Sequence, residues 1–163
     1  MTPSPAPGRY LPIYLNDHLA GATGGVELAR RLRSSNLGDP EMAGPLAQIC
    51  VEIEEDREAL VQLMERLEIG RHPIKPLLAR LAERLGRLKL NGQIRGYSPL
   101  SRVLELEILA AGIGGKTQLW NALAECFGES LEGFDFRALA ERADRQRQRI
   151  EDLHLAATSR ALP

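Results

Sequence analysis

The chain has 163 residues, a length typical of one domain, and its 21 Lys and Arg against 22 Asp and Glu give a formal net charge of -1. That balance excludes a generally basic nucleic-acid-binding protein and an acidic disordered chain. Apolar residues make up 44% and aromatic residues 4%, so the core must be mainly aliphatic, and no uncharged apolar run is long enough to predict a membrane span. The N-terminus shows no secretion signal, and Cys50 and Cys126 lie in separate apolar segments, as reduced thiols do. We therefore expect a cytoplasmic protein with neither a nucleic-acid nor a membrane partner.

Residues 1–8 contain three prolines and a glycine, so we expect a flexible leader followed by a single domain over 9–160. The first predicted helix covers 10–35, where apolar residues recur every three or four positions. The second covers 40 to about 68, with Asp39 as the predicted N-cap and Pro40 as the first helical residue.

A shorter helix is predicted over 74–90, and a long one from Pro99 to about Phe127 with Ser98 as its N-cap. The last helix is predicted to open at Asp135, and no segment shows the two-residue alternation of a strand. The long helices are thus joined by a short, a long and a short connection, and the long one can cross the bundle from end to end. This pattern predicts an all-α fold, a ferritin-like four-helix bundle with a long crossover containing a short fifth helix.

Two groups of glycines interrupt predicted helices, Gly21, Gly24 and Gly25 in the first, and Gly112, Gly114 and Gly115 in the third long helix. Each costs about 1 kcal/mol relative to alanine inside a helix, so a compensating contact is expected. We expect close packing of the two helices at Gly21, Gly25 and Gly112. A bend or break at these positions is the alternative.

Residues 110–117, Ala-Ala-Gly-Ile-Gly-Gly-Lys-Thr, approximate a phosphate-binding loop in which Lys116 would reach the terminal phosphates. Such a loop must follow a strand of a parallel sheet. Residues 103–109 are apolar enough for one strand, but no second buried strand is predicted. Nucleotide binding is therefore the weaker hypothesis for this segment.

Acidic or histidine residues occur near the middle of each long helix, as a di-iron or manganese carboxylate bundle requires. Glu151 and His154 have the Glu-x-x-His spacing, which places two ligands on one helical face. The candidate metal ligands are Glu52, Glu55, Glu105, Glu107, Glu151, His154 and His18.

Three stretches carry a resemblance to a known group of proteins: residues 15–30 (LNDHLAGATGGVELAR), residues 86–92 (GRLKLNG), and Ser98-Pro-Leu-Ser-Arg102 followed by Glu105. The chain resembles uncharacterised bacterial proteins that look ferritin-like, over most of residues 10–158. That resemblance implies no assigned activity, although ferritin-like enzymes as a class bind iron or manganese.

The second helix departs from the metal pattern because it lacks Glu-x-x-His. Arg57 continues its apolar stripe, and an inward-pointing arginine needs a buried anion. Glu107 and Asp17 are the candidate partners. The first hypothesis is therefore a structural buried ion pair of Arg57, Glu107 and Asp17 in a bundle without cofactor. Such a protein would be non-enzymatic and act by association, as a homo-oligomer or with an unknown protein partner. The alternative is a divergent protein that binds iron or manganese.

Overall fold

The computed structural model describes residues 8–72, 97–128 and 130–162. In this part the chain forms helices α1 (Tyr10–Ser35), α2 (Ala43–Arg66), α4 (Pro99–Phe127) and α5 (Phe136–Ala161), with short strands β1 (Ser130–Leu131) and β2 (Phe134–Asp135). The predicted all-α fold is confirmed. The predicted helix over 74–90 and all but the last residue of the predicted leader lie outside the described residues.

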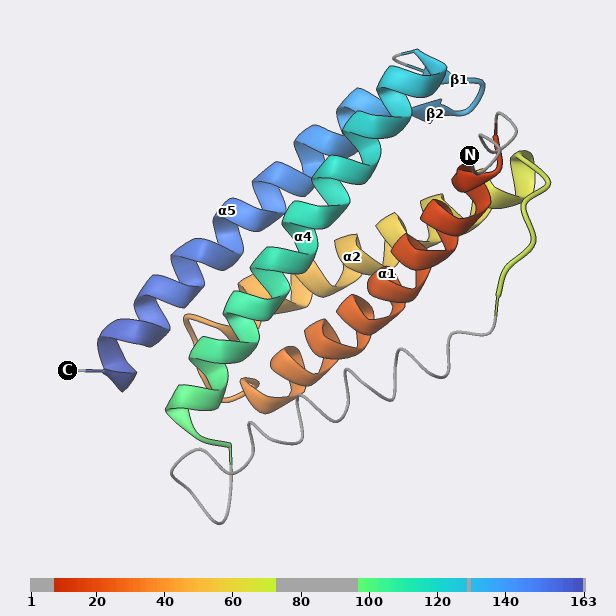
Figure 1. Ribbon diagram of the computed structural model, residues 1–163. Coiled ribbons are helices and arrows are strands. Elements are labelled where there is room, and N and C mark those ends of the chain that lie inside the picture. The colour runs from red at the N-terminus through yellow and green to blue at the C-terminus, as the bar shows by residue number, and fades with distance from the viewer. Residues whose placement is uncertain (1–7, 73–96, 129, 163) are drawn as a thin grey trace, which may run out of the picture.

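The four helices form two antiparallel pairs, α1 with α2 and α4 with α5, and α1 also packs against α4 (Figure 1). Helices α2 and α4 run in the same direction, so the end of α2 and the start of α4 lie at opposite ends of the molecule.

Three helix starts show how local chemistry sets the boundaries. The Ser98 hydroxyl accepts the Ser101 N–H at 3.0 Å, and the Asp135 carboxylate accepts the Ala138 N–H at 2.9 Å, so both predicted N-caps are confirmed. Asp39 instead accepts the N–H of Glu41 at 3.1 Å and caps a turn that precedes α2. Helix α2 therefore begins three residues later than predicted.

A short hairpin joins α4 to α5, and the prediction of no strand was wrong here. Leu131 pairs with Phe134 in antiparallel register, and Gly133 turns the chain with a φ of 90°. Strands of two residues are too short to show alternation in the sequence.

The core between the helices is mainly aliphatic, as the composition predicts. Its largest side chains are Trp120 and Phe136, both fully buried, whose rings stack with centroids 6.4 Å apart. Within the described residues, no helix is both long and apolar enough to span a membrane.

The expected glycine packing is not found. Helices α1 and α4 continue through both glycine groups without a break. A Cβ atom added at Gly21, Gly25 or Gly112 would meet no atom within 4 Å. These glycines therefore do not mediate close approach of the two helices.

Candidate functional site

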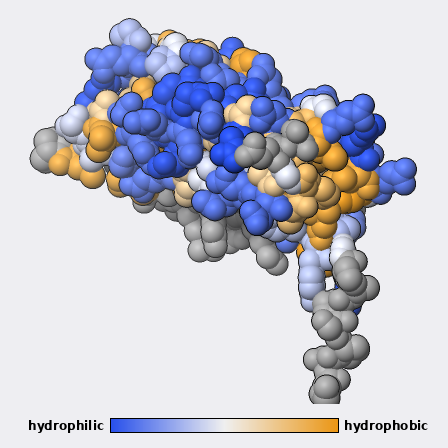
Figure 2. Space-filling model, turned by 90° about the horizontal axis from the view of Figure 1, so that it is seen from above, coloured by the Kyte–Doolittle hydropathy of each residue, from blue (hydrophilic) through white to orange (hydrophobic). Residues whose placement is uncertain are grey.

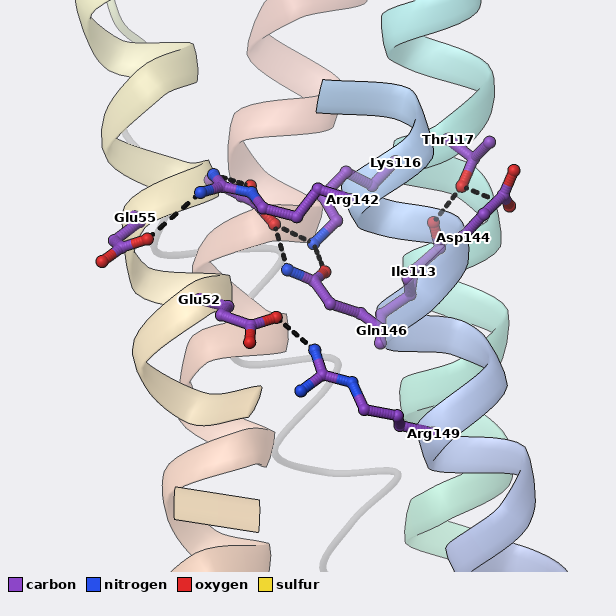
Figure 3. A network of polar contacts seen from close by, with 10 residues as sticks. Glu52, Glu55, Ile113, Lys116, Thr117, Arg142, Asp144, Gln146 and Arg149 are labelled. Atoms are coloured by element: carbon purple, nitrogen blue, oxygen red, sulfur yellow. Dashed lines mark hydrogen bonds and ion pairs between the residues drawn. The ribbon is translucent and has the colours of Figure 1, made fainter. Parts of the chain in front are cut away.

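A layer of charged and polar side chains lies inside the bundle, and we call Asp56, Lys116, Arg142 and Gln146 the polar layer (Figure 3). Asp56 lies three residues after Ile53 and four before Leu60, both of which are buried. Gln146 has the same spacing between Ala143 and Ile150 in α5. Both residues thus occupy positions of the apolar stripe, which is why their side chains point inward.

Asp56 is the centre of this layer, with 2% of its surface exposed. Its Oδ2 accepts the amide N–H of Gln146 at 2.9 Å and an N–H of Lys116. Its Oδ1 pairs with the Arg142 guanidinium, and Lys116 also donates to Oε1 of Gln146. Helices α2, α4 and α5 are therefore joined through one carboxylate.

Two further ion pairs border the polar layer and join α2 to α5. Arg142 also pairs with Glu55 at 3.1 Å, and Arg149 pairs with Glu52. The backbones of α2 and α5 approach each other less closely than those of α4 and α5. Long charged side chains from α2 and α5 therefore span the larger distance between these two helices.

Burial sets the electrostatics of the layer. It lowers the pKa of Lys116, because desolvation penalises the ammonium form more than the Asp56 charge favours it, and Arg142 adds to the lowering. Two cations, Lys116 and Arg142, face two carboxylates, Asp56 and Glu55. The layer together with the bordering Glu55 is thus close to neutral, and these charges are already paired within the protein.

A second buried acid lies toward the other end of α4. Glu105 is fully buried, forms an ion pair with Arg31 at 2.8 Å and accepts the Tyr97 hydroxyl at 3.0 Å. Burial and the neighbouring Glu105 charge raise the pKa of Tyr97 well above its ordinary value. This cluster ties α1 to the start of α4.

An open pocket of about 550 Å³ lies near that end of the bundle, where α1, α4 and α5 meet the turn before α2. Arg102 and Arg160 line it, and both pair with Asp39, at 3.1 and 3.0 Å. The charges of this pocket are therefore also paired within the chain.

The predicted ion pair of Arg57 with Glu107 or Asp17 was wrong. Arg57 donates to the Thr23 hydroxyl at 3.2 Å, while Asp17 is exposed. Glu107 lies on the surface of α4 and pairs with His154 at 3.0 Å. The buried carboxylate of α2 is Asp56, one residue before Arg57. The three-and-four spacing of the stripe allows both positions, and in the structure it is Asp56 that faces inward.

The structure does not bring the predicted metal ligands together as a set. Glu52, Glu55 and Glu151 pair with Arg149, Arg142 and Arg147, Glu105 pairs with Arg31, and the His18 ring packs edge-on against Tyr14. Glu107 and His154 contact each other. In the described ranges, no three His, Cys, Asp or Glu side chains gather where they could hold a metal ion.

The segment that approximates a phosphate-binding loop is helical throughout and lies inside α4. Its Lys116 belongs to the polar layer. Sequence reasoning missed Asp56, Lys116 and Gln146 as a group, although the stripe spacing includes Asp56 and Gln146 among the positions that can face inward.

Comparison of the chain with models of protein families, with curated proteins and with solved structures gives no match.

Proposed function

We propose that the protein is a ferritin-like helical bundle whose centre is closed by paired charges, and that it acts by protein association and not by catalysis. The parallel course of α2 and α4 supports the ferritin-like connectivity, since a long crossover must join them.

The polar layer is the observation that carries this proposal. Its side chains are of the types that bind metals or substrates, yet Asp56, Lys116, Arg142 and Gln146 pair with one another. A ligand at this position would have to replace several charge-assisted hydrogen bonds. The arrangement instead fixes the register of the helices, as buried polar groups do in some helical bundles.

Association is supported by an apolar surface at one end of the molecule. Figure 2 shows hydrophobic residues gathered at the end that carries the hairpin and the start of α1. Tyr10 and Ile13 of α1 are 63% and 50% exposed. The partner we propose is a second copy of this chain, because a net charge of -1 opposes self-association only weakly.

The metal content of protein purified without chelator tests the first part of the proposal. We expect iron, manganese and zinc all well below one atom per chain. A stoichiometric metal that is lost in the double variant Glu107→Ala, His154→Ala would overturn the proposal in favour of a metal-binding protein.

Light scattering after size exclusion tests the second part. We expect the wild-type protein to be a dimer, the Ile13→Glu variant to be a monomer, and the Leu155→Glu variant to remain a dimer. Leu155 serves as the control because it is 65% exposed but lies near the C-terminal end of α5, away from the apolar surface. A monomer at all concentrations, or equal effects of both variants, would contradict a dimer through this surface.

A further inference from the structure

The polar layer brings together a primary amine, a carboxamide and a carboxylate in a buried place. Lys116 on α4 contacts Oε1 of Gln146 on α5 and Oδ2 of Asp56 on α2. The same Asp56 oxygen accepts the amide N–H of Gln146 at 2.9 Å. One carboxylate oxygen therefore touches both the amine and the amide nitrogen that would leave in an acyl transfer.

From this arrangement we infer that Lys116 and Gln146 can form an intramolecular isopeptide bond between α4 and α5, with Asp56 as the proton-transfer group. Holding the reacting groups in contact gives the high effective concentration that an uncatalysed amide exchange lacks. Gln146 is fully buried, which keeps competing water away from its carboxamide.

The reaction balances without any further reactant. The lone pair of the neutral Lys116 amine adds to Cδ of Gln146, and the electrons of the carbonyl bond move onto its oxygen. Asp56 takes a proton from the attacking nitrogen and passes it to Nε2 of Gln146. The bond between Cδ and Nε2 then breaks, the carbonyl re-forms and ammonia leaves, so Asp56 ends in its starting protonation state.

The surroundings raise the fraction of neutral amine, which this reaction needs, above that of an exposed lysine. The pKa of Lys116 is lowered, with burial as the largest cause and the Arg142 charge as a further one. The charges that face the amine from the packed helices are Asp56 and Glu52 of α2 and Arg142 of α5. Asp56 is held by Arg142 on its other oxygen, which orients the carboxylate.

Intact-mass spectrometry of the whole chain tests the inference directly. We expect a species lighter than the sequence by one ammonia, whose fraction grows during incubation of the folded protein. Trypsin should leave Lys116 uncut, so that peptide 103–137 carries the dipeptide Gln146-Arg147 as a branch. This map separates the cross-link from ammonia loss at other sites, such as Asn91-Gly92.

Matched variants assign the roles. Lys116→Arg keeps the charge but removes the primary amine, and Asp56→Asn keeps the shape but removes the carboxylate, so both should lose the branched peptide. Gln148→Ala, at an exposed position of α5, should keep it. Circular dichroism checks that each variant is helical.

The wild-type protein alone can overturn the inference, whether or not the variants fold. Full sequence mass after incubation, with Lys116 cleaved normally, would refute it. Loss of one water with Lys116 joined to Asp56 would also refute it, because the acyl group would then come from the wrong residue.

Discussion

Asp56 shows at the scale of one residue what the buried charges do. Its carboxylate accepts from three side chains on two other helices, and 2% of its surface is exposed. Removing one member of such a group leaves the others buried without a partner, which costs more than the group contributes as a whole.

We therefore predict that Asp56→Ala lowers the free energy of unfolding by about 3 kcal/mol or more. Urea unfolding followed by circular dichroism measures it. The matched control is Glu58→Ala, an exposed acid two residues along α2, which should change stability by less than about 0.5 kcal/mol. Equal effects of the two substitutions would contradict the central place of Asp56.

Tyr97 gives a second prediction, on the dependence of stability on pH. Burial, followed by the Glu105 charge, raises the pKa of Tyr97 in the folded protein above its ordinary value of about 10. Above that pH the unfolded chain loses the phenol proton while the folded chain keeps it. The folded state then binds more protons, so stability falls as pH rises.

Urea unfolding at several pH values between about 9 and 11 measures this slope. The loss of stability should be smaller in Tyr97→Phe, which has no phenol to titrate. A slope that is the same in both proteins would show that Tyr97 does not cause it.

The sequence identified the right kind of interaction at the centre but the wrong residues. Counting along α2 by threes and fours reaches both position 56 and position 57. The sequence pattern assigns Arg57 to the stripe, and its inward charge would then need a buried anion. Half-burial lets Arg57 reach the Thr23 hydroxyl instead. Choosing between adjacent positions needs the rotation of the helix, which depends on packing against the other helices.

At the scale of the helices, the open glycines lead to a third prediction. A methyl group at Gly21 or Gly112 meets no atom within 4 Å. Gly21→Ala and Gly112→Ala should therefore each raise stability by about 0.5–1 kcal/mol, because alanine loses less backbone entropy in a helix. Thermal unfolding measures both.

Gly133→Ala is the contrasting substitution. Gly133 turns the hairpin at a φ of 90°, where a Cβ atom is strained, so this change should lower the melting temperature. A loss of stability in Gly21→Ala or Gly112→Ala would instead favour the close packing that the sequence predicted.

Helix starts provide a fourth prediction. The Ser98 hydroxyl accepts the N–H of Ser101 at 3.0 Å, and Ser98 is buried. Ser98→Ala should cost about 1 kcal/mol in urea unfolding, whereas Ser98→Asp should cost less because aspartate also caps. Equal losses in both variants would indicate that the loss of stability comes from altered packing around Ser98 and not from the lost N-cap hydrogen bond.

The sequence predicted the ends of a helix accurately where a capping side chain or a glycine with positive φ marks the boundary. Helix α4 begins and ends at the predicted residues, between Ser98 and Gly128. The hairpin before α5 was missed, because its four paired residues carry no periodicity of their own. Its position depends on the ends of α4 and α5, which no local pattern records.

At the scale of the whole molecule, the lengths of the connections between helices predicted the directions of the helices better than any motif predicted a site. Short connections made α1 and α2, and α4 and α5, antiparallel pairs, and the long one allowed α2 and α4 to run in parallel. The motif-based predictions were less successful. The spacing of Glu151 and His154 fits a metal ligand pair, but Glu151 pairs with Arg147 and His154 with Glu107.

Ion pairs between α2 and α5 join the two helical pairs. A double-mutant cycle of Asp56→Ala and Arg142→Ala, measured by urea unfolding, tests this role most directly. We predict that the two losses are not additive, with a coupling energy above about 1 kcal/mol. Losses that add to within about 0.5 kcal/mol would contradict it, since the pair would then contribute nothing to joining the helices.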